Sequence, residues 1–324
     1  MRRQDLSRGA TTRTSGGFSL IELLVGVGIS LVIALAAAAM YMTTAGIGRA
    51  NLRVSEIQSN GQMAMDALRR DIINAGFRGL TGDPVQITRA AVAITNDCGG
   101  NSSGFSMNLR QGVWGANDTN PFTASCIPTA NYLRGDLLAV RRLGITPTGT
   151  LAATRLYVRS AFQAAEYFLG NAPPALAFNP MADYAADASV YFISPFTVSA
   201  DESPQVPALY RVRLLPGPAM SAPELVASGV EDLQVQFDVR DWETGDVRIL
   251  DAGGAPLDAG GAATGFTGWE DAVAIRVFLL VRAQTGETGF EPGSRTYALG
   301  SSQLTFNDNI PRQVMSSVFS LRNR

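Results

Sequence analysis

A single carboxylate lies inside the longest apolar run of the sequence. Residues 18–42 are almost wholly apolar, and Glu22 is the only charged residue among them. Placing a carboxylate in a hydrocarbon layer costs roughly 2.5–3.5 kcal/mol on insertion scales. A group in that position is expected to have a partner or a function, so Glu22 is the first candidate site residue.

The only two cysteines, Cys98 and Cys126, lie 28 positions apart. In a segment exported to an oxidising compartment, an even number of cysteines is typical of a disulfide. The loop-entropy model assigns such a bridge roughly 3–4 kcal/mol of stability. Two buried free thiols are the alternative. A metal site would need further ligands, and none lies nearby at metal-binding spacing.

The sequence contains no histidine. Its absence removes the commonest general base, every Ser-His or Cys-His nucleophile arrangement and the commonest zinc ligand. The 26 basic and 28 acidic residues give a formal net charge of −2, so no basic face for nucleic acid is expected. We therefore expect no enzymatic activity, no catalytic residues, no metal, no cofactor and no nucleic-acid partner.

Two short segments rich in Asn and Asp could offer oxygen ligands to calcium. They are residues 117–120 and 307–309. Asn and Asp side chains also accept hydrogen bonds from their own backbone in turns. The sequence favours turns at both places over a calcium site.

One long helix is predicted to position Glu22. Residues 18–42, at a rise of ~1.5 Å per residue, are long enough to cross a ~30 Å hydrocarbon layer. Beyond them, apolar residues recur at steps of three and four as far as about Ala75, where Gly76 and Gly79 predict a stop. This amphipathic stripe consists of Val54, Ile57, Gly61, Met65, Leu68 and Ile72. Asp66 precedes Arg70 by four residues, the favoured order for an ion pair on a helix surface.

Beyond Gly79 the pattern changes to that of strands. Seven are predicted, at residues 136–142, 155–159, 189–193, 209–214, 233–239, 273–281 and 313–321. Residues 96–128, 144–154 and 245–268 are expected to be long loops of unassigned role. The predicted fold is α+β, with a long N-terminal helix packed on a mainly antiparallel sheet.

The residues around Glu22 resemble a known processing signal. The segment from Gly17 and Phe18 through Ser19, Leu20, Ile21 and Glu22 is similar to the type IV prepilin signature. That resemblance implies that a prepilin peptidase cleaves between Gly17 and Phe18 and methylates the new amino terminus on Phe18. Residues 1–17 would then be a leader, and its four arginines, at positions 2, 3, 8 and 13, favour a cytoplasmic N-terminus.

Two other interpretations of this end stay open. Small residues at 36–39 could belong to the cleavage site of an ordinary secretory signal, although its apolar region should span only ~7–15 residues and carry no acid. A plain membrane anchor would account for the length of the run. It would account neither for the Gly17-Phe18 junction nor for Glu22.

The prepilin resemblance also implies a division of the chain. Residues 18–42 would be the transmembrane and assembly helix, residues 43–76 its amphipathic continuation, and residues 77–324 an exported, β-rich globular domain. After cleavage Glu22 becomes the fifth residue of the mature chain. There it could neutralise the amino terminus of a neighbouring subunit, which makes it the expected assembly contact.

The C-terminal part narrows the resemblance to one type of pilin. Residues 230–237 (VEDLQVQF) and 274–282, and the ending at 312–314 and 321–323, are similar to PilW-type minor pilins, as are residues 65–77. This resemblance implies a minor pilin that helps to initiate pilus assembly. Its partners would be other minor and major pilins, the prepilin peptidase, the inner-membrane assembly machinery and membrane lipid.

The implied location is the cytoplasmic (inner) membrane. The chain would cross it once, with its N-terminus inside and its globular domain exported, and would enter the pilus or its tip on assembly. A J-type pseudopilin of a type II secretion system is the nearest alternative, since the closing strand is similar in both. A membrane-anchored periplasmic enzyme is the alternative from another class.

Overall fold

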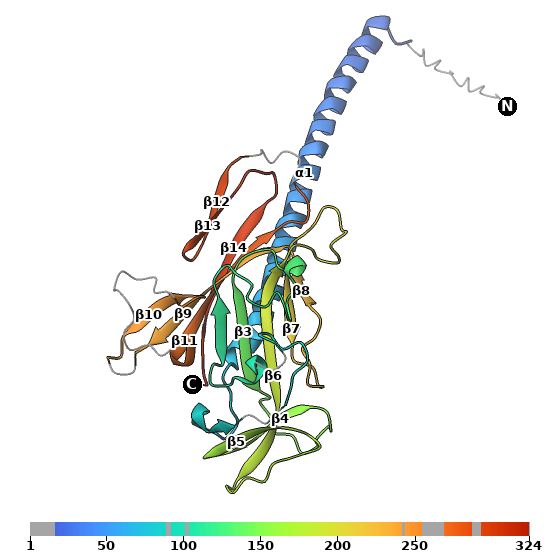
Figure 1. Ribbon diagram of the computed structural model, residues 1–324. Helices are drawn as coiled ribbons and strands as arrows, with labels where there is room; N and C mark the ends of the chain where they lie inside the picture. The colour runs from blue at the N-terminus through green and yellow to red at the C-terminus, as the bar shows by residue number, and fades with distance from the viewer. Residues whose placement is uncertain are drawn as a thin grey trace, which may run out of the picture. The chain divides into compact units, whose positions relative to one another are not determined.

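The computed structural model describes residues 17–88, 92–100, 104–241, 244–254, 269–286 and 293–323. The chain divides into two compact units, residues 1–52 and 53–324. The predicted α+β class is confirmed, because one long N-terminal helix is combined with mainly antiparallel sheets (Figure 1). The leader up to residue 16 lies outside the described residues, and the predicted segment boundaries stay predictions.

Helix α1 (Leu20–Ile73) begins two residues after the predicted start and ends two residues before the predicted end. At its C-terminus the N–H of Asn74 bonds to the carbonyl of Asp71 at 3.2 Å, which tightens the last turn. Gly76 then has a φ of 71°, a left-handed conformation that glycine adopts readily. Its N–H donates to the Arg141 carbonyl at 2.9 Å, so the chain turns from the helix onto a strand.

The second unit contains an eight-stranded sheet whose main path is β1-β5-β4-β6-β3-β2, with β7 paired to β6 and β8 paired to β7. All these pairs are antiparallel except β1 with β5. The strands are β1 (Ile87–Thr88), β2 (Val113–Ala116), β3 (Leu137–Leu143), β4 (Leu156–Ala161), β5 (Ala164–Leu169), β6 (Met181–Ser194), β7 (Ala208–Arg213) and β8 (Glu224–Ser228).

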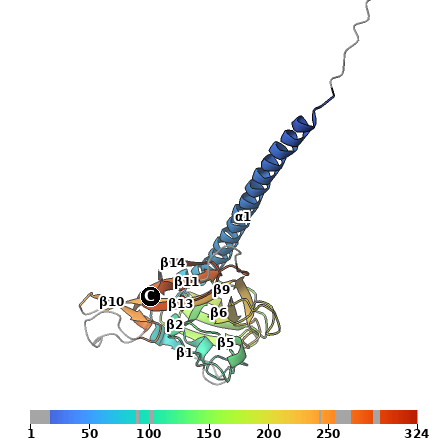
Figure 2. The ribbon, with the colours of Figure 1, turned by 90° about the horizontal axis from the view of Figure 1, so that it is seen from above.

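A second, four-stranded antiparallel sheet has the order β10-β9-β11-β14. Its strands are β9 (Val230–Arg240), β10 (Val247–Asp251), β11 (Ala272–Arg282) and β14 (Arg312–Ser320). A hairpin of β12 (Arg295–Leu299) and β13 (Ser302–Phe306) forms a third, two-stranded sheet. Short 3-10 helices lie at Pro84–Gln86, Phe105–Met107, Thr129–Asn131 and Trp269–Asp271. Figure 2 shows the strands of this unit from a second side.

Two hydrophobic cores lie on opposite faces of the large sheet. Alternate residues of β3 show the division, because Leu138 and Val140 belong to one core and Leu137 and Ala139 to the other. The first core also contains Leu68 and Ile72 of α1 and the inward residues of β9 and β11. The second core is closed by residues of the segment 92–127, including both cysteines. Thus the rear of α1 is packed between the two sheets of the second unit.

All seven predicted strands are present, but two of the predicted loops are partly wrong. The segment 96–128 contains β2, and the segment 245–268 contains β10, while residues 101–103 and 255–268 lie outside the described part. Residues 144–154 contain neither helix nor strand, as expected. The strands β2 and β10 are short, so neither shows the long alternation on which the prediction relied.

Candidate assembly site

The first turn of α1 brings Glu22 back onto the start of the helix. The N–H of Ser19 donates to the Glu22 carboxylate at 3.1 Å, and the N–H of Glu22 donates to the Ser19 hydroxyl at 3.2 Å. This reciprocal arrangement is a capping box, which satisfies two backbone donors at a helix N-terminus. The Leu23 N–H bonds to the Ser19 carbonyl at 3.1 Å as the first regular helical bond. Gly17 and Phe18 therefore lie immediately before the cap.

Glu22 also lies on a groove along the surface of α1 within the first unit. Residues at steps of four line it: Phe18, Glu22, Gly26, Ser30 and Ala34, with larger apolar side chains beside them. The Ser30 hydroxyl donates to the carbonyl of Gly26 at 2.7 Å, so it is satisfied within its own helix. Small residues in this pattern allow two helices to approach closely in a membrane.

The apolar side chains of this part of α1 are exposed in the chain by itself. Phe18 is 86% exposed and Leu24 is 64% exposed. Within the part of the chain that the structure describes, α1 is the one helix long and apolar enough to cross a membrane. An apolar surface of this extent needs lipid or protein to cover it.

The rear of α1 has the opposite character. The residues buried there are Ile57, Gly61, Ala64, Leu68, Asp71 and Ile72. The predicted stripe is thus confirmed at Ile57, Gly61, Leu68 and Ile72, while Met65 is only partly buried. The stripe is wrong at Val54, which is 47% exposed because it lies ahead of the first turn that meets the core.

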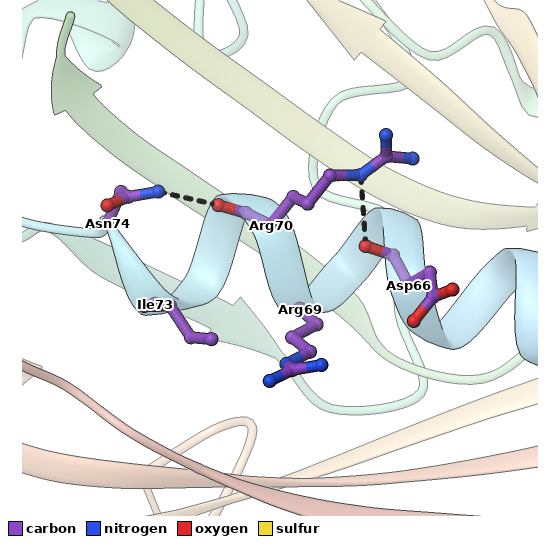
Figure 3. Close-up of a pocket in the computed structure, with 5 residues that line it drawn as sticks. All are labelled: Asp66, Arg69, Arg70, Ile73 and Asn74. Atoms are coloured by element: carbon purple, nitrogen blue, oxygen red, sulfur yellow. Dashed lines mark hydrogen bonds between the residues drawn. The ribbon is translucent and has the colours of Figure 1, made fainter. Parts of the chain in front are cut away.

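The predicted surface ion pair of Asp66 with Arg70 is not formed. The Nε atom of Arg70 donates instead to the backbone carbonyl of Asp66 at 3.2 Å. Figure 3 shows the Asp66 carboxylate pointing away from the guanidinium, while Asn74 donates to the Arg70 carbonyl. The arginine therefore binds the helix backbone near its negative C-terminal end, where a cation is favoured.

A buried carboxylate fixes the rear of α1 to the large sheet. Asp71 accepts the Tyr191 hydroxyl at 2.6 Å and Arg142 at 3.3 Å, and Arg142 also pairs with Asp187 at 2.6 Å. Burial and the adjacent Asp71 charge raise the pKa of Tyr191 above its usual range, so the phenol stays a donor. This contact was not predicted. The signal in the sequence was an acid within the buried stripe, three residues after Leu68 and directly before Ile72, at a position where an apolar residue would be expected.

The predicted disulfide is confirmed, since Cys98 and Cys126 are joined. Both are buried in the second core, and the bridge closes a 28-residue loop over the large sheet. The alternative of two free thiols is therefore excluded.

The Asx-rich segments form turns, as the sequence favoured. The Asn120 side chain accepts the N–H of Phe122 at 2.9 Å, and Asp308 accepts the N–H of Ile310 at 3.0 Å. Asp308 also pairs with Arg312 at 2.7 Å. Among the described residues, no group of three or more His, Cys, Asp or Glu side chains could hold a metal ion.

A cluster of three acids, Asp118, Asp136 and Asp232, lies between the start of β3 and β9. Asp136 accepts backbone N–H groups of Asp118 at 3.0 Å and Val235 at 2.7 Å, and Gln234 bridges Asp118 and Asp232 at 3.0 Å each. Burial, more than the neighbouring carboxylates, raises the pKa of Asp136 to about 7 and that of Asp232 to about 6. The cluster joins two strands through these hydrogen bonds, so we assign it a structural role.

The comparison with known families concerns the C-terminal part. Residues 190–323 match the family model PilW, described as type IV Pilus-assembly protein W. No curated protein and no solved structure matches the chain significantly. The match runs from the second half of β6 to just beyond β14, and so covers the whole four-stranded sheet that packs on α1. PilW is a family of pilus-assembly proteins rather than a known family of enzymes. Together with the apolar helix α1, the match supports a PilW-type pilus protein that is anchored in a membrane and interacts with other pilus proteins.

Proposed function

We propose that this chain is a minor pilin that takes part in the initiation of type IV pilus assembly. The observation that carries the proposal is the PilW match over residues 190–323, in a chain whose α1 exposes a long apolar surface. A helix of this kind anchors the precursor in the inner membrane and afterwards packs among the helices of other minor and major pilins. Deletion of the gene should abolish or sharply reduce surface pili, and the intact chain should restore them.

The same deletion tests the J-type pseudopilin alternative. Normal pili together with a failure to secrete folded proteins would assign the chain to a type II secretion system instead. The PilW match favours the pilus.

We further propose that the prepilin peptidase cleaves between Gly17 and Phe18 and methylates Phe18. Cleavage there would leave Ser19 and Glu22, the two residues of the capping box, in the mature chain. Mass spectrometry of the mature protein should find methylated Phe18 at the N-terminus, and Gly17→Val should leave the precursor uncut. A mature chain that starts near Ala39 or Met40 would contradict this proposal and would favour a secretory signal.

Glu22 is the proposed assembly contact. Among the described residues its carboxylate accepts only from Ser19 at the start of its own helix, and it lies on the groove of small residues. When a neighbouring helix packs into that groove, its amino terminus can meet the carboxylate. Two groups that are costly in lipid then form one charge-assisted contact, which also sets the axial register of the helices.

The proposed topology places the N-terminus in the cytoplasm and the second unit outside. The arginines of the leader favour this orientation, and the disulfide is typical of an oxidising compartment. A maleimide that cannot cross the membrane should label a cysteine introduced at exposed Val198 in cells with an opened outer membrane. Labelling only after lysis of the inner membrane would place the second unit in the cytoplasm and would contradict the proposed topology.

A further inference from the structure

A shallow groove lies in the second unit between the last turns of α1 and the final strand. Met65, Asp66, Arg69 and Ile73 line it from the helix, and residues 317–320 with Arg322 line it from β14 and its end. Figure 3 shows that Arg69 and Arg70 point to opposite sides of the helix, so only Arg69 belongs to this groove.

Two arginines of the groove are unpaired. Arg69 and Arg322 are exposed, and neither has a hydrogen bond or an ion pair to another residue that the structure describes. By contrast, at least seven other arginines of this unit pair with carboxylates: Arg142, Arg159, Arg211, Arg213, Arg276, Arg282 and Arg312. Asp66 is the only acid that lines the groove, so the lining carries an excess positive charge. Arginine presents a planar fork that matches a carboxylate.

The strand that borders the groove is an unpaired sheet edge. Among the described strands, β14 pairs only with β11, in an uninterrupted register from Arg312 to Ser320. It has no bulge, and its sequence contains neither proline nor lysine, the features that usually protect such an edge. Val318 on this strand is 58% exposed.

The ladder determines which backbone groups face outward. The Leu321 N–H donates to the Val273 carbonyl at 2.9 Å, and the Ala283 N–H donates to the Pro311 carbonyl at 3.0 Å. Because N–H and C=O groups alternate between the two sides of a strand, the odd-numbered residues of β14 bond to β11. The backbone groups of Ser316, Val318 and Ser320 therefore point away from the sheet.

We propose that β14 receives an extended, acidic segment of another pilus protein, which pairs with its outer edge and places carboxylates on Arg69 and Arg322. This proposal rests on the pilus function proposed above and names the surface through which the second unit meets a partner. The open backbone ladder favours a peptide, because only a strand can satisfy its N–H and C=O groups in register. The negative end of α1 accounts for a cation on the helix but not for Arg322, which lies beyond β14.

The test uses the full chain in membranes, co-expressed in turn with each pilus protein encoded beside it. A photoreactive p-benzoylphenylalanine at Val318 should crosslink to one of them, within a segment that contains Asp or Glu. The double variant Arg69→Glu with Arg322→Glu should lower the crosslink yield at least tenfold. Arg110→Glu, a reversal at an exposed arginine outside the groove, should leave it unchanged.

A second variant tests the strand edge without charge. Val318→Pro removes an outward N–H and leaves the bonds to β11, so the melting temperature should stay within a few degrees of wild type while co-purification falls. Unchanged crosslinking and co-purification in the variants would contradict peptide binding at β14. The proposed pilus function would not be affected by that result. Crosslinks to lipid alone would overturn the peptide partner. Failure of the wild-type chain to co-purify with any pilus protein would overturn both proposals.

Discussion

The two halves of α1 differ in what covers them, although they form one helix. Leu20 and Leu24 in the front half are more than half exposed, whereas Leu68 and Ile72 in the rear are fully buried between two sheets. The hydrogen bonds of the acidic residues differ between the two halves in the same way. Within the part of the chain that the structure describes, Glu22 bonds only within its own turn, whereas Asp71 bonds to two residues of the large sheet.

The two halves of α1 therefore depend on different contacts for their stability. The rear half is held by contacts within the chain, so its substitutions should alter the free energy of unfolding. The front half carries exposed apolar side chains, and this surface is expected to be covered by lipid and by other subunits. Substitutions there should change assembly and leave folding almost unaffected.

The largest expected effect is on the rear half. Leu68→Ala should lower the free energy of unfolding by about 2–5 kcal/mol, because it leaves a cavity where the side chain is fully buried. Leu24→Ala is the matched control, since the same change at an exposed site should cost less than about 0.5 kcal/mol. Urea titration of both purified variants in detergent measures the difference. Equal losses in the two variants would contradict the division of α1.

The next effect concerns the disulfide of the second unit. Cys126→Ser should lower the free energy of unfolding by roughly 3 kcal/mol, since the unfolded chain gains the freedom of the opened loop. The melting temperature of the oxidised and reduced wild type provides the control. Alkylation of the unreduced, denatured protein should detect no free thiol, and a signal from both cysteines would disprove the bridge in the exported protein.

The sequence predicted the parts of the fold that repeat a long pattern. The alternation of β9 and β11 and the apolar stripe from Ile57 to Ile72 are each sustained over several residues. The hairpin of β12 and β13 was missed because alternating residues are exposed or only half-buried, so it lacks an apolar face. Strand β5 was missed because Ala164 and Ala165 have low strand propensity, and burial against β4 decides its conformation.

The candidate site was predictable only where chemistry and position coincide in the sequence. Glu22 is conspicuous as the single charge of an apolar run. Its place in a line with Gly26, Ser30 and Ala34 was not predicted, because that line contains a single glycine, although serine and alanine also permit close packing. The contact of Asp71 with Tyr191 joins residues 120 positions apart, so no local pattern could show it.

A smaller effect is expected from pH, within the second unit alone. Burial raises the pKa of Asp136 to about 7 and that of Asp232 to about 6, so the folded chain keeps protons that the unfolded chain releases near pH 4. The stability contributed by these protons is complete below about pH 4 and is lost as the pH rises through 6 and 7. Each proton contributes at most about 1.4 kcal/mol per pH unit.

Urea titrations between pH 5 and 8 measure this loss. Wild type should lose stability across that range more steeply than Asp136→Asn, which cannot titrate there. Asp201→Asn, a change at an exposed turn, should keep the wild-type slope. Parallel curves for wild type and Asp136→Asn would mean that the carboxyl remains ionised when buried, held by its two backbone donors. Tyr132 adjoins the cluster, and burial raises its pKa above its usual range, so it should stay protonated between pH 5 and 8.

The smallest change in folding stability is expected at Glu22, where the effect should be on assembly. Glu22 has two separable roles, because its carboxylate accepts the Ser19 N–H and also carries a charge. Glu22→Gln keeps an acceptor for the capping box but has no charge, whereas Glu22→Ala loses both. If neutralisation of a neighbour's amino terminus drives assembly, both variants should insert and be cleaved normally, and both should fail to co-purify with other pilins. If only Glu22→Ala failed to co-purify with other pilins, Glu22 would act in assembly through the capping box and not through its charge. Normal co-purification of both would show that the front half of α1 finds its register without this carboxylate.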